Sequence, residues 1–146
     1  MSSNYKSLFF EDVRVGEELP QLSLPVTITK LVMGDSAGRD WSPQHHDRDY
    51  VQNEMNIRDV FLPTSFYMGI IARFVTDWAG PESFFSSMEF QMREPICPGD
   101  DMKITGKVVG TRVEDGKHLV DLEIQVANQN GPTTPASVTI ELPSRS

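Results

Sequence analysis

Residues 63–81 read PTSFYMGIIARFVTDWAGP and carry the strongest helical pattern in the chain. Apolar side chains recur there at spacings of three and four, which is the period of an α-helix. The recurring residues are Phe66, Tyr67, Ile70, Ile71, Phe74, Val75 and Trp78. Pro63 and Thr64 mark the start of the helix and Gly80-Pro81 its end. Because the apolar face is wide, we expect a long helix that is buried on most sides.

After Pro81, apolar and polar residues alternate with period two, which is typical of antiparallel strands. Strand-like alternation covers residues 88–92, 103–108, 120–126 and 136–142. Turn signals separate these runs, at Pro98-Gly99-Asp100, Asp115-Gly116 and Asn130-Gly131. The second half of the chain is therefore predicted to be one antiparallel sheet.

The first half adds one strand and two short helices. Residues 22–28 alternate like a strand, and Pro25 within them indicates a sheet edge or a bulge. Thr29 is expected to cap a weak helix that runs to about Ala37. Asp47 is expected to cap a second helix over residues 48–53. With about five strands and one long helix, the chain is predicted to be α+β, a curved antiparallel sheet wrapped around one central hydrophobic helix.

Length, composition and charge limit the classes of function. The 146 residues, 38% of them hydrophobic, fit one domain spanning residues 1–146. A lone Cys97 can form no internal disulfide, and no apolar run approaches the roughly 18 residues of a membrane span. We therefore expect a soluble, cytoplasmic protein without a membrane partner. The net charge of −8 and the absence of a Lys/Arg cluster argue against a nucleic-acid partner.

Residues 39–47 concentrate titratable groups, with two carboxylates and two imidazoles in nine positions. Ser42-Pro43 enforces an extended path, so this stretch is expected to be a loop after the first helix. Taken alone, Asp40 could cap a turn and His45 could be a surface residue. A metal site is not expected, because the adjacent His45 and His46 point in different directions and no i, i+4 pair of ligands is present.

The order of elements and three motifs resemble the MaoC-like, (R)-specific enoyl-CoA hydratases of the hotdog fold. The motifs are the opening FEDVRVG at residues 10–16, the Asp40-x-x-Pro43-x-His45 spacing followed by Asp47, and the turn Pro98-Gly99-Asp100. Residues 39–49 and 75–81 resemble, more narrowly, the small MaoC-like hydratase subunits of actinobacterial steroid side-chain degradation, each of which is one half of a heteromeric hydratase. The resemblance spans nearly the whole chain.

The resemblance implies catalytic roles for Asp40 and His45, and the chemistry of the two side chains agrees. Adding water to an α,β-unsaturated thioester requires a base for the water and an acid for the α-carbon, and a carboxylate and an imidazole on one loop can hold a water between them. The residues leave open which of the two is the acid. By alignment with a family glycine, the backbone N–H of Thr64 at the start of the long helix would meet the enolate oxygen.

The chain departs from the family pattern at three positions. Arg39 and Ser42 replace the glycine and asparagine of the usual Ser-Gly-Asp-x-Asn-Pro run, and Thr64 replaces the glycine at the helix start. Because a hydroxyl offers one donor where an amide offers two, Ser42 could orient water differently. Ser42 and His46 are expected to support the site rather than to react.

The resulting expectation is a lyase of lipid metabolism that hydrates a trans-2-enoyl-CoA to a 3-hydroxyacyl-CoA, on a steroid side chain or another bulky acyl group. No cofactor is expected, because coenzyme A is part of the substrate. We expect a homodimer, or a heteromer with a second MaoC-like subunit. Two alternatives stay open, a non-catalytic subunit that shapes the acyl tunnel and a hotdog acyl-CoA thioesterase.

The residues that bind the coenzyme A phosphates are not identified by the sequence. Six scattered bases could contribute, and such residues are more often solvated surface charges. These bases are Arg39, Arg48, Arg58, Arg93, Lys103 and Lys107.

Overall fold

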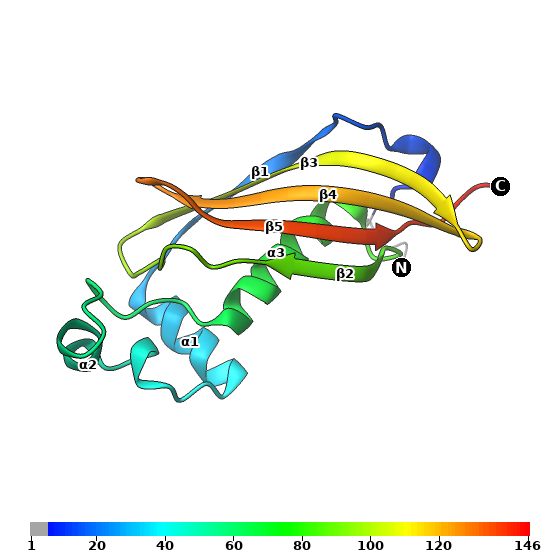
Figure 1. Ribbon diagram of the computed structural model, residues 1–146. Helices are drawn as coiled ribbons and strands as arrows, with labels where there is room; N and C mark the ends of the chain where they lie inside the picture. The colour runs from blue at the N-terminus through cyan, green and yellow to red at the C-terminus, as the bar shows by residue number, and fades with distance from the viewer. Residues whose placement is uncertain (1–5) are drawn as a thin grey trace.

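The computed structural model describes residues 6–146, and its centre is the predicted long helix. This helix, α3 (Thr64–Ala79), lies against one face of a five-stranded antiparallel sheet (Figure 1). Its buried residues face the sheet at helical spacing, from Tyr67 through Ile71 and Phe74 to Ala79. The prediction of a long helix that is buried on a wide face is confirmed.

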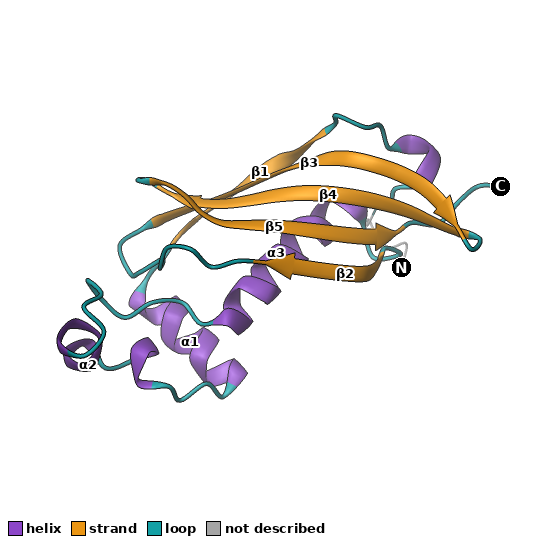
Figure 2. Ribbon diagram, in the orientation of Figure 1, coloured by secondary structure: helices purple, strands orange, loops and turns teal. Residues whose placement is uncertain are grey.

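The sheet is formed by β1 (Glu18–Pro25), β2 (Phe84–Phe90), β3 (Asp101–Glu114), β4 (Lys117–Asn128) and β5 (Gly131–Glu141). Its spatial order is β1-β3-β4-β5-β2, and every neighbouring pair is antiparallel. As the period-two pattern requires, one face carries buried side chains, such as Ile104, Leu122 and Val138, while the other carries Lys103, Glu123 and Ser137. The α+β architecture of a hotdog fold, with a curved sheet around one helix, is confirmed (Figure 2).

One glycine lets the helix approach the sheet closely. Gly106 in β3 pairs with Ile124 of β4, and a Cβ at this position would lie 2.9 Å from Cε1 of Phe74 in α3. The ring of Phe74 therefore occupies the space that any larger residue at position 106 would need.

The remaining helices cluster at one end of the sheet (Figure 1). They are α1 (Ile28–Gly38) and α2 (Arg48–Asn53), with a 3₁₀ turn η2 at Pro43–His45 between them. A second 3₁₀ turn, η1 at Phe10–Asp12, lies at the opposite end of the sheet (Figure 1), where the N–H of Phe10 donates to the Pro143 carbonyl at 2.9 Å. Helix α1 packs against both α3 and η2. This cluster brings the loop of residues 39–47 to the start of α3.

Two local predictions need correction. Thr27, not Thr29, caps α1, because Thr27 is extended and its Oγ1 accepts the N–H of Lys30 at 3.1 Å. The strand ends at Pro25, and Ile28, which the alternation placed in that strand, therefore begins the helix. Strand β2 also ends at Phe90, before the expected Met92, since Pro135 of β5 has no N–H to continue the ladder.

Two other local predictions, the edge position of Pro25 and the cap of α2, are confirmed. Pro25 closes β1, which is an edge strand with a register shift between Leu19 and Leu22. The Asp47 carboxylate accepts the N–H of Tyr50 at 3.0 Å and caps α2. None of the helices in residues 6–146 is long and apolar enough to cross a membrane.

Candidate active site

Asp40 and His45 face each other on the loop that joins α1 to α2. Helix α1 ends in a left-handed residue, Arg39 (φ 53°), and the N–H of Asp40 donates to the carbonyl of Asp35 at 3.1 Å. The turn η2 then folds His45 inward, where it is only 4% exposed. His45 Nε2 lies 3.4 Å from Oδ2 of Asp40. The five-residue spacing thus brings the predicted carboxylate and imidazole together.

The other nitrogen of His45 is held by a backbone carbonyl. Nδ1 lies 2.7 Å from the oxygen of Phe61, sixteen residues further along the chain. A carbonyl can only accept a hydrogen bond, so Nδ1 carries a hydrogen and donates it. Nε2 is therefore the nitrogen left for chemistry, and it points toward Asp40.

Asp40 is held in its ionised form by Ser42. The N–H of Ser42 donates to Oδ1 of Asp40 at 3.2 Å. Hydrogen bonding from the hydroxyl and the N–H of Ser42 lowers the pKa of Asp40, and the nearby His45 lowers it further. Ser42 thus touches Asp40 directly, and its supporting role in the site stays a prediction.

His46 lies differently. Its ring is exposed, and its N–H donates to the carbonyl of Pro43 at 3.1 Å. The structure therefore places His46 in the loop that carries the site, and within residues 6–146 its side chain forms no hydrogen bond or ion pair with Asp40 or His45. In the part of the chain described here, no group of three or more His, Cys, Asp or Glu side chains is arranged to hold a metal ion.

The start of α3 lies beside this loop. A Cβ on Gly38, two residues before Asp40, would meet Oγ of Ser65 at 2.8 Å. The backbone N–H groups of Thr64 and Ser65 find no backbone acceptor within residues 6–146. Because α3 has sixteen residues, these free N–H groups also sit at the positive end of a long helix dipole. The site therefore has donors for an anionic oxygen near its acid–base pair.

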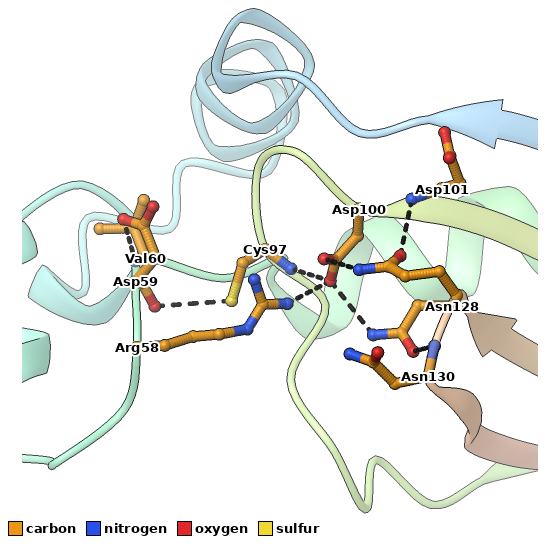
Figure 3. A network of polar contacts seen from close by, with 9 residues as sticks. Arg58, Asp59, Val60, Cys97, Asp100, Asp101, Asn128 and Asn130 are labelled. Carbon is orange, nitrogen blue, oxygen red and sulfur yellow. Dashed lines mark hydrogen bonds and ion pairs between the residues drawn. The ribbon is translucent and has the colours of Figure 1, made fainter.

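A buried polar network holds the segment that carries the Phe61 carbonyl (Figure 3). The Asp100 carboxylate, which is 1% exposed, accepts from Arg58 and from the N–H of Cys97 at 3.0 Å. Side-chain amides of Asn128 at 3.2 Å and Gln129 at 2.9 Å complete its partners. The turn before β3, the β4–β5 hairpin and the loop before α3 are thus joined at one carboxylate.

Charge and burial oppose each other in this network. Burial raises the pKa of Asp100, but the hydrogen bonds from Cys97, Gln129, Arg58 and Asn128 outweigh it, and the net pKa is lowered. Burial raises the pKa of the free Cys97 thiol to about 11. Cys97 is therefore a protonated core residue rather than a nucleophile.

Several of the bases considered for coenzyme A phosphates are engaged elsewhere. Arg48 forms a two-pronged ion pair with Asp59 at 2.7 and 3.1 Å. Arg58 is bound to Asp100, and Lys107 lies 3.6 Å from Glu123. These contacts point to structural roles for Arg48 and Arg58, and the residues that would bind the phosphates stay unassigned.

One acidic residue beside the site was missed by sequence reasoning. Asp35 lies on α1, is 4% exposed, and neither of its carboxylate oxygens has a hydrogen-bond partner in residues 6–146. The sequence feature that could have identified Asp35 is its position four residues after Leu31, which places both residues on the buried side of the helix. A carboxylate on that side of a helix is unusual enough to mark a site.

Comparison with known proteins gives one relative of clear sequence similarity. The chain is 32% identical over 128 residues to the 3-oxo-4,17-pregnadiene-20-carboxyl-CoA hydratase beta subunit of Mycobacterium tuberculosis, covering 88% of this chain and 95% of the relative. No family model matches the chain.

Solved structures agree with that relationship. The crystal structure of the ChsH1-ChsH2 complex from Mycobacterium tuberculosis is similar with a TM-score of 0.81 and 31% identity, covering 89% of this chain and 98% of the other. The unliganded R-hydratase PhaJ1 from Pseudomonas aeruginosa shares the fold, with a TM-score of 0.82, 18% identity, and coverage of 95% and 88%. Sequence identity over nearly the full length and the shared fold therefore place this chain in the MaoC-like enoyl-CoA hydratase family of hotdog-fold enzymes.

Proposed function

We propose that this chain is the catalytic subunit of a hydratase that adds water across the C2–C3 double bond of a trans-2-enoyl-CoA. The hydroxyl goes to C3 and a proton goes to C2, which gives a 3-hydroxyacyl-CoA, of (R) configuration by family resemblance. The observation that most supports this proposal is the distance of 3.4 Å between Oδ2 of Asp40 and Nε2 of His45, beside free N–H groups at the start of a long helix.

In this proposal the pair holds the reacting water and handles both protons. One group accepts a proton from the water and the other delivers a proton to C2, so a single proton exchange between them restores the pair. Ser42 keeps Asp40 oriented, and the Phe61 carbonyl keeps Nε2 of His45 directed at the water. His46 supports the loop through its backbone.

The developing enolate needs a donor for its thioester oxygen. We assign this to the backbone N–H of Thr64, at the first position of α3, where the helix dipole favours negative charge. Chemistry of this kind uses no cofactor beyond the coenzyme A of the substrate.

An apolar groove beside the site would take the acyl group. It has a volume of about 440 Å³ and lies between α1 and α3, lined by Gly34, Ala37, Gly38, Ser65, Phe66, Gly69, Ile70 and Arg73. Small residues keep it open on both helices, and Ser65 connects it to the start of α3. A groove of this size suits a bulky ring-bearing acyl group, and the naming of the Mycobacterium tuberculosis relative supports a steroid side-chain thioester.

Replacing Gly69 tests this assignment. A Cβ at Gly69 meets nothing within 4 Å, so Gly69→Leu should fold and fill the groove. We expect kcat/KM to fall at least tenfold for a bulky enoyl-CoA and to change less than threefold for a short one, because about 1–3 kcal/mol of acyl contact is lost. Equal losses on both substrates would remove the groove from the proposal.

We further propose that the chain works in a heteromer with a second MaoC-like subunit, in the cytoplasm. The similarity to a chain of the ChsH1-ChsH2 complex supports the heteromer, and the free thiol of Cys97 fits a reducing compartment. Native mass measurement of the chain, expressed alone and with a candidate partner, distinguishes a homodimer from a heteromer.

The activity itself is tested with the purified protein, alone and with that partner. Hydration should lower the ultraviolet absorbance of the enoyl thioester without releasing free coenzyme A. Release of coenzyme A from a saturated acyl-CoA would instead favour a thioesterase, and no absorbance change with any assembly would overturn the proposal.

A further inference from the structure

Arg73 carries the charged side chain of the apolar groove between α1 and α3. Within residues 6–146 the rest of the lining is uncharged, and Ser65 is its other polar side chain. Between these two residues on α3, the groove is lined by Phe66, Gly69 and Ile70. Polar side chains therefore occur at the two ends of the groove. In ligand pockets, a few polar groups in an apolar lining fix the orientation of what binds.

The two ends of the groove are separated by two turns of α3. Ser65, Gly69 and Arg73 recur every four residues, so they lie on one side of the helix. Ser65 marks the end near the candidate site, because a Cβ on Gly38 would lie 2.8 Å from its Oγ. Arg73 is eight residues further along, which is about 12 Å along the helix axis. A substrate whose thioester lies at Thr64 would therefore bring the far end of a bulky acyl group to Arg73.

The guanidinium of Arg73 retains free donors. Its side chain is 56% exposed, and Nε lies 3.4 Å from Oδ2 of Asp77, one turn further along α3. This is the one hydrogen bond of the Arg73 side chain within residues 6–146, so the N–H groups of its two terminal nitrogens remain available to a ligand. An exposed i, i+4 ion pair of this kind contributes little to stability. The fold itself therefore gives no strong reason for an arginine at this end of the groove.

The chemistry of Arg73 defines the group that it can recognise. A guanidinium donates hydrogen bonds and cannot accept them, so its partner must be an acceptor oxygen. Asp77 already places a negative charge beside the guanidinium, and Asp77 is not among the residues that line the groove. A second carboxylate at this position would be repelled by Asp77, whereas the neutral oxygen of a ketone would not. The free donors of Arg73 thus suit a ketone.

We propose that Arg73 is a specificity-determining residue that donates hydrogen bonds to a ketone oxygen at the far end of the acyl group. The inference rests on the proposed hydratase function and narrows its substrate to a ring-bearing acyl group with such an oxygen. Because the ketone lies far from the bonds that change, its contact with Arg73 is equally strong in the bound substrate and in the transition state. Such uniform binding lowers KM and leaves kcat unchanged.

The test compares two steroid enoyl-CoA thioesters that differ at one position. The ring farthest from the thioester carries a ketone in one and a methylene group in the other. The intact assembly contains wild-type chain, Arg73→Met, which keeps an apolar side chain of similar length without donors, or Arg73→Lys, which keeps a charged donor. Asp77→Asn is the matched control, because it removes the ion pair and leaves the lining of the groove unchanged.

Wild type should prefer the ketone substrate by about tenfold in kcat/KM, through KM, as expected for one hydrogen bond to a charged group. Arg73→Met should reduce this preference to less than about twofold while kcat on the methylene substrate stays unchanged. Arg73→Lys should keep part of the preference, and Asp77→Asn should keep all of it.

The proposal is overturned if wild type shows no preference, or if Arg73→Met keeps the wild-type preference. Equal losses on both substrates would also overturn it, since they would show that Arg73 supports the groove without recognising the ketone. Isothermal titration calorimetry with the matching saturated acyl-CoA pair separates this role from the activity. If no assembly hydrates either enoyl-CoA, the proposed function fails. Tighter binding of the saturated ketone compound that is lost in Arg73→Met would still support the role of Arg73, and equal binding of the pair would refute it.

Discussion

Replacement of Asp100 by alanine is expected to destabilise the chain and to slow catalysis, although Asp100 does not touch the candidate site. The carboxylate joins Arg58 to the turn before β3 and to the β4–β5 hairpin. Residues 58–61 lead directly to the carbonyl that binds Nδ1 of His45. Loss of Asp100 therefore releases the segment that orients the imidazole.

The size of the destabilisation depends on which hydrogen-bond partners of Asp100 stay buried once its carboxylate is removed. The N–H of Cys97 lies in the core and would lose its acceptor, at a cost of about 1–3 kcal/mol. Arg58 is half exposed, so water can solvate its guanidinium once Asp100 is gone. Loss of the Arg58–Asp100 ion pair therefore adds less than about 1 kcal/mol to the destabilisation. Asn128 and Gln129 are partly or fully exposed and add little. We therefore expect a loss of about 1–4 kcal/mol in the free energy of unfolding.

Thermal unfolding at fixed protein concentration measures this loss. The unfolding entropy of 146 residues is about 0.3 kcal/mol per degree, so Tm should fall by roughly 3–13 °C. Asp101→Ala is the matched control, because Asp101 is the adjacent, exposed aspartate and should change stability by less than about 0.5 kcal/mol.

The activity of the same variants links the network to the site. At 25 °C, Asp100→Ala should retain its fold and lose about tenfold or more in kcat through displacement of His45. Two results would refute the reasoning that the network holds the imidazole. One is a Tm of Asp100→Ala equal to that of the control, and the other is a lowered Tm with full activity at 25 °C.

Three further predictions concern the same core. The pKa of Asp100 is lowered in the folded protein, so its carboxylate stabilises the fold fully above its unfolded-state pKa of about 3.9, and this stabilisation is lost as pH falls through the folded-state pKa. The difference in urea midpoint between wild type and Asp100→Ala should therefore shrink between pH 7 and pH 3. A constant difference would contradict this prediction. Gly106→Ala should cost about 1–3 kcal/mol through its clash with Phe74, and Phe74→Leu in the same chain should recover part of the loss; additive costs in thermal unfolding would exclude this packing. Cys97, with its pKa raised to about 11, should react with a thiol reagent far more slowly in the native protein than in denaturant, and equal rates would show that the thiol is accessible.

Elements governed by neighbouring residues could be predicted from the sequence. The Asp47 cap and α2 depend on contacts within four residues, and the face of α3 depends on a repeated spacing. The order of the strands could not be derived, since alternation specifies a strand but not its neighbour. The sequence prediction placed the cap at Thr29 instead of Thr27, because either threonine fits a cap locally and only the end of β1 at Pro25 decides between them.

The candidate site also has parts that could be predicted from the sequence and parts that could not. The spacing of Asp40 and His45 was visible in the sequence, and the resemblance to MaoC-like hydratases gave it meaning. The Phe61 carbonyl is a backbone atom sixteen residues away and leaves no sequence signal. Asp35 was overlooked because a single carboxylate in a weak helix usually faces solvent, and only packing of α1 against α3 and η2 buries it.

The central claim is that this chain supplies both groups that perform the hydration. The most direct measurement is the rate of hydration of an enoyl-CoA by the intact assembly that contains wild-type chain, Asp40→Asn or His45→Ala. Each variant should assemble normally and lose about 10²- to 10⁴-fold in kcat, and the double variant should lose little more than the worse single one, since the two groups act as a unit. Full activity of both single variants would mean that the acid and base lie in another chain, and would contradict the account.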